Sequence, residues 1–134
     1  MKAGTSVVFL PCRDIQKTEA FYHGILGLEE EKQGGNVLIF DTGYGLWGFC
    51  AYMDSRPPLS GEKGVCLSLN LESAEAVDRV FEKLRDLVTV VQGPAHHPDF
   101  PVYSCFIADP DGYRVELQFT GERKDSPADR KVER

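Results

Sequence analysis

Charged and polar side chains share one face of a strand that is predicted in the segment DPDGYRVELQF, residues 109–119. Successive side chains of a strand point to opposite faces, so Arg114, Glu116 and Gln118 lie on one face and apolar residues on the other. A carboxylate in that position can bind a polar ligand, or act as a general base if water is excluded. Alternatively, Glu116 and Arg114 form a simple surface ion pair, which is common and weak. Both interpretations stay open.

A second polar set alternates with apolar residues in the segment VCLSLNL, residues 65–71. The apolar members are predicted to pack against a helix, which leaves Cys66, Ser68 and Asn70 on the opposite face. Polar groups are costly to bury without partners. A hollow lined by this set and by the polar side chains of 109–119 is therefore expected to hold a ligand or water.

Two amphipathic helices position these strands. Apolar contacts follow the i, i+3, i+4, i+7 spacing in both helices, at Thr18, Phe21, Tyr22 and Ile25 and at Val77, Val80, Phe81 and Leu84, an offset of 59 residues. The same offset relates two predicted N-cap residues, Asp14 and Ser73. Two independent signals therefore indicate an internal repeat.

The repeat also relates two glycine turns, TGYG at 42–45 and PDG at 110–112, at an offset of 67 residues. This alignment equates Phe49 with Glu116. Because Glu116 is assigned to the face away from the helix, Trp47 and Phe49 are predicted to share that orientation.

Aromatic residues are thus predicted to line the hollow from the first half of the chain. In the first strand, alternation assigns Leu10 to the helix side and leaves Val7 and Phe9 on the other. Trp47 and Phe49 would add planar surfaces for stacking on a ligand. The alternative is that these rings simply fill the space between the two halves of the chain.

The order of elements predicts an α+β fold, in which two βαβββ modules form curved mixed sheets around a cup-shaped cleft. The first module covers residues 1–52 and the second covers 65–120. A polar linker containing two adjacent prolines is expected at 53–64, because proline disfavours both helix and central strand. Residues 121–134 have almost no apolar side chains and are predicted to form a flexible C-terminal tail.

Composition and net charge bear on the partners, the compartment and the cysteine chemistry of the protein. The chain has 134 residues and a net charge of -6, which argues against nucleic acid as a partner. It contains no apolar run of about 18 residues, so a membrane span is not predicted and the cytoplasm is the expected compartment. The four cysteines are widely spaced and are predicted to be reduced and mostly buried.

Two adjacent histidines occur in the loop GPAHHPDFP, residues 93–101. Consecutive side chains of an extended chain diverge, so His96 and His97 are not expected to bind one ion together. We expect one histidine to contact a ligand together with Phe100 and Tyr103, because loops on a rigid scaffold often carry recognition. The alternative is that both histidines are ordinary solvent-exposed loop residues.

The segments FYHGILGLEEE and DPDGYRVEL, together with the repeat, resemble the vicinal oxygen chelate superfamily. This superfamily includes glyoxalase I, extradiol dioxygenases, fosfomycin-resistance enzymes and bleomycin-resistance proteins. The resemblance covers about residues 5–120 and is specific for the fold rather than for the reaction. It implies a homodimer, since relatives commonly form their grooves where modules of two chains meet.

The resemblance also implies where a metal would be held in metal-using members, at one position on the first and last strand of each module. In this sequence those positions fall on Val7, Phe49, Cys66 and Glu116. Valine and phenylalanine carry no donor atom, and a divalent ion needs several nitrogen, oxygen or sulfur ligands. The usual metal centre is therefore not predicted.

We predict a metal-independent protein of the glyoxalase/bleomycin-resistance type that holds an aromatic or amphipathic small molecule. Glu116 is a candidate catalytic residue, and the predicted ligand contacts are Phe9, Trp47, Phe49, Ser68, Asn70, His96, Phe100, Tyr103, Arg114 and Gln118. No cofactor is predicted, and the acidic charge favours a cationic ligand. The alternative is a glyoxalase-like lyase or dioxygenase with a divalent metal in an atypical site that includes Glu116. A third interpretation is catalysis without metal, with Glu116 as base and Arg114 stabilising an enolate-like anion.

Overall fold

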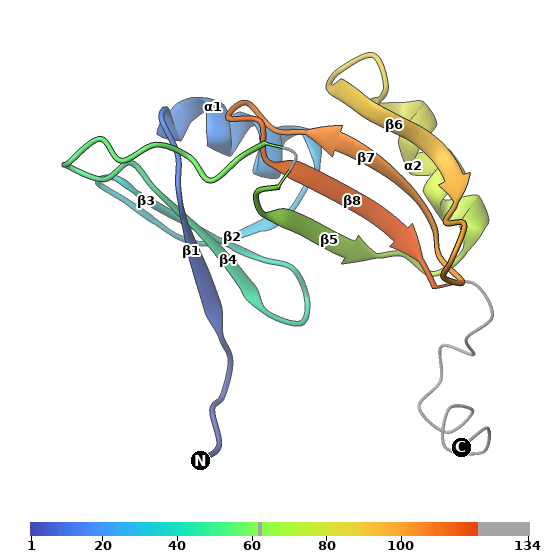
Figure 1. The fold of residues 1–134 in the computed structure, drawn as a ribbon. Coiled ribbons are helices and arrows are strands. Elements are labelled where there is room, and N and C mark those ends of the chain that lie inside the picture. The colour runs from blue at the N-terminus through green and yellow to red at the C-terminus, as the bar shows by residue number, and fades with distance from the viewer. Residues whose placement is uncertain (62, 121–134) are drawn as a thin grey trace. The chain divides into compact units, whose positions relative to one another are not determined.

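The computed structural model describes residues 1–61 and 63–120, and contains two four-stranded sheets (Figure 1). The first half forms β1 (Val7–Pro11), α1 (Ile15–Glu19), the π-helix η1 (Ala20–Ile25), β2 (Glu29–Gly34), β3 (Val37–Asp41) and β4 (Leu46–Cys50). The second half forms β5 (Cys66–Asn70), α2 (Ala74–Leu84), β6 (Thr89–His96), β7 (Tyr103–Ala108) and β8 (Arg114–Phe119). The predicted tail, 121–134, lies outside the described residues.

The two sheets have the same strand order. One sheet runs β1-β4-β3-β2 and the other runs β5-β8-β7-β6, so the corresponding strands occupy corresponding places. In the first sheet β1 and β4 are parallel, and the remaining neighbours are antiparallel. The predicted α+β fold with two βαβββ modules is therefore confirmed.

Both predicted N-caps are present. The Asp14 carboxylate accepts hydrogen bonds from the backbone N–H groups of Gln16 (2.9 Å) and Lys17 (3.2 Å). The Ser73 hydroxyl accepts one from the N–H of Ala76 at 3.0 Å. These bonds satisfy amide groups that the first turn of a helix leaves without partners. The first helix then widens into η1, a change that the apolar spacing did not predict.

An aromatic cluster forms the core of the first module. The ring of Tyr22, from η1, stacks on Phe49 with centroids 4.5 Å apart and lies 5.6 Å from Phe40. All three side chains are fully buried. Burial of such rings supplies much of the free energy that holds a small module together.

A mainly aliphatic cluster, which includes one aromatic ring, Phe81, forms the core of the second module. It is made of α2 residues and the apolar alternates of the strands, namely Leu67, Val77, Phe81, Leu84, Cys105, Ile107, Val115 and Leu117. This set includes three of the four α2 positions that the sequence predicted, which confirms the helix face. The cysteines differ in burial: Cys12 and Cys105 are buried as expected, whereas Cys66 is exposed.

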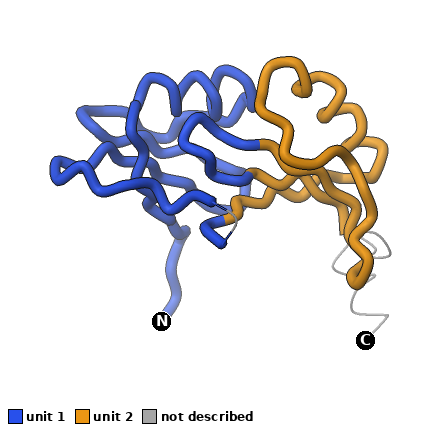
Figure 2. Tube along the Cα trace, turned by 45° about the horizontal axis from the view of Figure 1, so that its top comes forward, with its two compact units in different colours: residues 1–65, 108–114 blue, residues 66–107, 115–134 orange. Residues whose placement is uncertain are grey.

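The chain divides into two compact units, and residues near the end of the second module belong to the first unit (Figure 2). Unit 1 contains Met1–Val65 and Ala108–Arg114, and unit 2 contains Cys66–Ile107 and the described residues from Val115 onward. No helix in the described part of the chain is long and apolar enough to cross a membrane.

The orientation of β4 differs from the prediction. In the parallel pair Leu10 lies opposite Phe49, and Leu10 is buried on the helix side. Trp47 and Phe49 therefore face the helix, and Trp47 lies edge-on to Tyr22 with ring centroids 6.3 Å apart. The expectation that these two rings face away from the helix was wrong.

The error has a simple cause. β4 begins at Leu46 and β8 at Arg114, so the strands correspond at an offset of 114 − 46 = 68 rather than 67. Because side chains alternate with a period of two, a shift of one residue exchanges the two faces completely. Gly48, and not Phe49, is the counterpart of Glu116.

Candidate functional site

The strongest candidate site is a row of polar side chains on β5 and β8 in unit 2. We define the polar face as Ser68, Asn70, Glu116 and Gln118. The Ser68 hydroxyl donates a hydrogen bond to Glu116 Oε1 at 2.7 Å, and Gln118 Nε2 donates one to Asn70 Oδ1 at 2.7 Å. Two cross-strand pairs therefore lie side by side on one surface of the sheet.

Local alternation explains why these four side chains face outward. Leu67 in β5 and Val115 and Leu117 in β8 are buried, whereas the residues between them are exposed or partly buried. The apolar alternates thus pack toward the module core and the polar ones point away from it. The alternation that the sequence predicted for these two strands is confirmed.

Glu116 is oriented by a neutral partner and not by Arg114. Its carboxylate accepts from Ser68, and no ion pair joins it to any residue in the described ranges 1–61 and 63–120. Arg114 likewise forms no ion pair within those ranges. The surface ion pair that the sequence left open is absent there, so no described cation lies within ion-pair distance of the carboxylate.

The polar face retains unused hydrogen-bonding capacity. A carboxylate has two acceptor oxygens, and Ser68 occupies only Oε1 of Glu116. The Asn70–Gln118 bond uses one amide oxygen and one amide nitrogen, which leaves Asn70 Nδ2 as a donor and Gln118 Oε1 as an acceptor. Next to this row, Cys66 Sγ lies 3.8 Å from Ser68 Oγ. The arrangement can therefore hydrogen-bond a ligand from several atoms at once.

Tyr103 and His96 also lie in unit 2, but their side chains make contacts away from the polar face. The Tyr103 hydroxyl donates a 2.6 Å hydrogen bond to Asp78 on α2, and this bond raises the pKa of Tyr103 to about 12. The His96 ring lies against the Tyr103 ring with centroids 4.8 Å apart. Because α2 packs on the apolar side of the sheet, these two residues do not join the polar face.

His97 organises its own loop. Its Nδ1 accepts hydrogen bonds from the backbone N–H groups of Asp99 at 3.0 Å and Phe100 at 3.2 Å. Its ring also contacts the Phe100 ring, with centroids 4.8 Å apart. The two adjacent histidines therefore have different neighbours, and Phe100 remains exposed at the surface.

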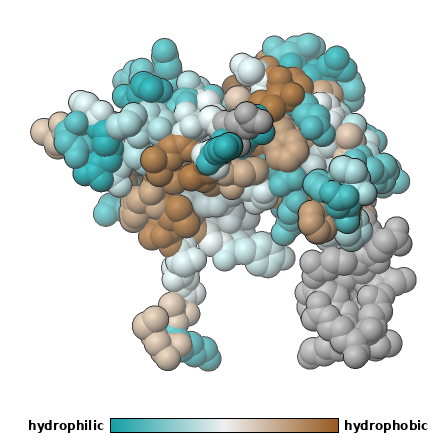
Figure 3. Space-filling model, in the orientation of Figure 1, coloured by the Kyte–Doolittle hydropathy of each residue, from teal (hydrophilic) through white to brown (hydrophobic). Residues whose placement is uncertain are grey.

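In unit 1, the surface opposite the helix side carries Phe9 and not the predicted pair of rings. Phe49 has no exposed surface with which to touch a ligand, whereas Phe9 is 46% exposed. The Phe9 ring covers Gly48, where an added Cβ would lie 2.6 Å from Phe9 Cδ1. Figure 3 shows apolar side chains gathered over β1.

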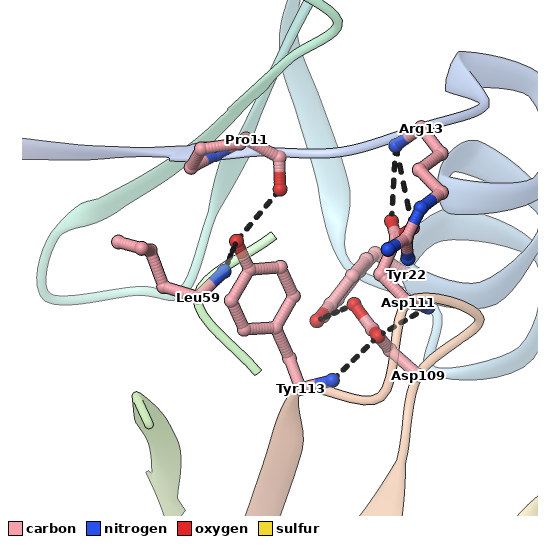
Figure 4. A network of polar contacts seen from close by, with 7 residues as sticks. All are labelled: Pro11, Arg13, Tyr22, Leu59, Asp109, Asp111 and Tyr113. Carbon is pink, nitrogen blue, oxygen red and sulfur yellow. Dashed lines mark hydrogen bonds and ion pairs between the residues drawn. The ribbon is translucent and has the colours of Figure 1, made fainter. Parts of the chain in front are cut away.

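Sequence reasoning missed a buried polar network at DPDGY, which it interpreted as a turn (Figure 4). Asp109 accepts hydrogen bonds from the Tyr22 hydroxyl at 2.8 Å and from the N–H groups of Asp111 at 2.8 Å and Tyr113 at 2.9 Å. Burial raises the pKa of Asp109, and burial together with the Asp109 charge raises the pKa of Tyr22. The only sequence signal was an acidic residue beside apolar strands.

The same segment makes further contacts inside unit 1. The Tyr113 hydroxyl donates to the Pro11 carbonyl at 2.7 Å and accepts from the Leu59 N–H at 3.0 Å. Asp111 accepts from the Arg13 N–H at 3.3 Å. Since Tyr113 is fully buried and Asp109 nearly so, the network stabilises unit 1 and leaves little surface for a ligand.

The residues do not fit the metal centre that the resemblance implies. With the corrected alignment, its four positions carry Val7, Gly48, Cys66 and Glu116, of which only the last two have donor atoms. Among the residues that the structure describes, no three histidine, cysteine, aspartate or glutamate side chains form a group that could hold a metal ion. A firmly bound divalent ion needs more ligands than these positions offer.

A comparison with models of protein families identifies one family. The sequence profile of the Glyoxalase/Bleomycin resistance protein/Dioxygenase superfamily matches residues 5–117. No curated protein matches the chain significantly.

Solved structures give the same result for the fold. A glyoxalase/bleomycin resistance protein/dioxygenase from Nocardioides has a TM-score of 0.73 at 17% identity, covering 94% of this chain and 89% of its own. A family enzyme from Burkholderia phytofirmans PsJN has a TM-score of 0.70 at 22% identity, with coverages of 85% and 96%. A lactoylglutathione lyase from Agrobacterium tumefaciens has a TM-score of 0.68 at 21% identity, with coverages of 88% and 94%. At these identities the similarity concerns the fold alone.

Proposed function

Because the chain belongs to the Glyoxalase/Bleomycin resistance protein/Dioxygenase superfamily, we propose that it is a metal-independent small-molecule-binding protein of the bleomycin-resistance type. The observation that carries this proposal is the polar face. On it, the Glu116 carboxylate is oriented by a hydrogen bond from Ser68 and has no ion-pair partner among the described residues. Oriented polar groups of this kind fix the position of a small ligand.

The donor set supports the metal-independent form of this function. Glycine and valine at two of the superfamily's four metal positions contribute nothing to coordination, whatever ion is present. Glu116 is then free to bind a ligand directly. Hydrogen bonds from a ligand to a charged carboxylate are about twice as strong as those between neutral groups.

Aromatic contact with the ligand is proposed for exposed rings only. Phe100, which belongs to the same unit as the polar face, is 64% exposed, so it can stack on an apolar group without rearrangement of a core. Trp47 and Phe49 are not part of the proposal, since both rings belong to the aromatic cluster around Tyr22.

We also propose that the protein forms a homodimer. Three consecutive apolar residues of β1, Val7, Val8 and Phe9, are 38%, 53% and 46% exposed, and β1 is an edge strand of its sheet. Exposed apolar edge strands favour association. Light scattering after size exclusion should give twice the chain mass, and Phe9→Ser should shift the population to monomer. A monomer at micromolar concentration would contradict the dimer.

Protein purified without chelators tests the binding function. Native mass spectrometry and metal analysis should show a retained or added small molecule at one per chain, without stoichiometric metal. The variant Glu116→Ala should lose the ligand, whereas Glu31→Ala, which removes an exposed carboxylate of β2, should keep it. Stoichiometric zinc, nickel, iron or manganese that is lost in Glu116→Ala would instead support a lyase or dioxygenase.

A further inference from the structure

We propose that Glu116, oriented by Ser68, binds the cationic nitrogen of the ligand, an ammonium or guanidinium group, and that the Asn70–Gln118 pair binds an amide or carbonyl beside it. This inference rests on the proposed function and names the chemical class of its ligand. It makes Ser68 a positioning residue, because the Ser68 hydroxyl orients the Glu116 carboxylate, whereas Asn70 and Gln118 both contact the ligand.

The charge of Glu116 is the first argument. The described residues form four ion pairs, at Arg13–Asp111, Arg56–Asp54, Arg79–Glu72 and Arg85–Glu82, and Glu116 takes part in none. It is partly buried in the middle of β8, where a carboxylate gains most from a partner that replaces its lost water. A cation from outside the described residues would supply that partner. The chain's net charge of -6 adds a long-range attraction for such a ligand.

The geometry of the Ser68 bond is the second argument. A hydroxyl has a single hydrogen, and Ser68 donates it to Glu116 Oε1 at 2.7 Å. The carboxylate is thereby held toward β5 with its Oε2 unoccupied by any described residue. An oriented acceptor costs less to order when a ligand binds, so Ser68 is expected to raise affinity without touching the ligand.

The neighbouring amide pair defines the rest of the ligand. Gln118 follows Glu116 by two residues on the same strand face, which corresponds to about 7 Å along the strand. Since Gln118 Nε2 and Asn70 Oδ1 satisfy each other, the pair presents one amide N–H₂ and one amide oxygen. These are the complementary groups of an amide or a hydroxyl-carbonyl pair. The expected ligand thus carries a cationic nitrogen about 7 Å from an uncharged polar group.

A pair of matched probes tests the cation preference. Uniformly ¹⁵N-labelled protein is titrated with 2-phenylethylammonium chloride and, separately, with neutral 2-phenylethanol, and amide shifts are followed by NMR. EDTA is present so that no divalent metal bridges the probe to Glu116. The ammonium probe should shift amides of β5 and β8 and bind at least tenfold more tightly than the alcohol.

Three variants separate the roles of the residues. Glu116→Gln should abolish the preference for the ammonium probe and leave the weak binding of the alcohol unchanged. Ser68→Ala should weaken ammonium binding by a few-fold, because the carboxylate remains and only its orientation is lost. Glu31→Gln removes the same charge from an exposed position in β2 and should change neither affinity by more than twofold.

Several outcomes would overturn the inference. Equal affinities for the ammonium and the alcohol, shifts confined to other strands, or equal losses in Glu116→Gln and Glu31→Gln would each do so. Without EDTA, shifts of the same amides by Zn²⁺ alone that vanish in Glu116→Gln would assign the carboxylate to a metal. If a retained ligand is found but the probes show no preference, the inference fails and the binding function stands. If no small molecule binds in either experiment, both fail.

Discussion

The two units have the same strand order, but the side chains on the surface opposite the helix side are apolar in unit 1 and polar in unit 2. In unit 1 the surface opposite the helix side carries Val7, Phe9 and Gly48, and in unit 2 the corresponding surface carries Ser68 and Glu116 with their neighbours. The helix-facing side chains are mainly apolar in both units because each core requires it. The difference therefore lies in the positions that the cores leave unconstrained, which are the positions available for function.

A second contrast concerns which residues form the core of each unit. The core of unit 2 consists mainly of aliphatic side chains from its own strands and α2. Unit 1 is closed by an aromatic cluster and by the segment 108–114, which is distant from the rest of the unit in sequence. The DPDGY turn thus serves as a structural part of unit 1, whereas the strand that follows it carries the candidate site.

Removing this long-range contact should have the largest effect on stability. Tyr113→Ala deletes a fully buried ring together with its bonds to Pro11 and Leu59, and should lower the free energy of unfolding by about 3–5 kcal/mol. Urea denaturation measures the loss. Phe100→Ala, at an exposed loop position, should cost less than about 0.5 kcal/mol. Equal losses for the two variants would show that unit 1 does not depend on this ring.

The glycine that matches Glu116 offers the next test. A methyl group at Gly48 would lie 2.6 Å from Phe9 Cδ1, so Gly48→Ala should destabilise the protein by about 1–3 kcal/mol. The double variant Gly48→Ala/Phe9→Ala should relieve the clash and cost no more than Phe9→Ala alone. Gly34→Ala, where no heavy atom lies within 4 Å, is the control. Additive losses in the double variant would contradict the close contact.

The raised pKa of Asp109 predicts how the stability of unit 1 depends on pH. Its pKa is raised by burial, so the protonated carboxyl is favoured in the folded state. The stability that it contributes is full below its unfolded pKa and falls as pH rises through the raised folded value. Asp109→Asn should remove this component. Urea midpoints measured from pH 3 to pH 7 should show the difference between wild type and variant shrinking with increasing pH. A difference that grows would contradict the raised pKa.

The polar face should matter least for stability. Glu116→Gln keeps the acceptor for Ser68 and changes a partly exposed side chain, so unfolding free energy should change by less than about 0.5 kcal/mol. Thermal unfolding checks this value. A loss above about 2 kcal/mol would mean that Glu116 serves the fold of unit 2 and would weaken its assignment to a ligand.

Much of the fold could be predicted from local patterns. The N-caps at Asp14 and Ser73 and the apolar stripe of α2 depend on residues within a few positions of one another, and all were confirmed. The faces of β5 and β8 were predictable for the same reason, since their apolar and polar residues alternate without interruption. β4, with the sequence LWGFC, has no such alternation, and its orientation had to be taken from an alignment of turns.

Sequence by itself determined the repeated element order, the helix starts and the polar character of one strand pair, because these follow from periods of 3.6 and 2 along a short stretch of chain. Only the tertiary structure decided that Phe49 stacks on Tyr22, that Ser68 rather than Arg114 holds Glu116, and that Asp109 bonds Tyr22 across 87 positions. The physical reason is that strand register and buried hydrogen bonds are set by partners far away in the chain. A shift of one residue in that register exchanges what is buried and what is free to bind.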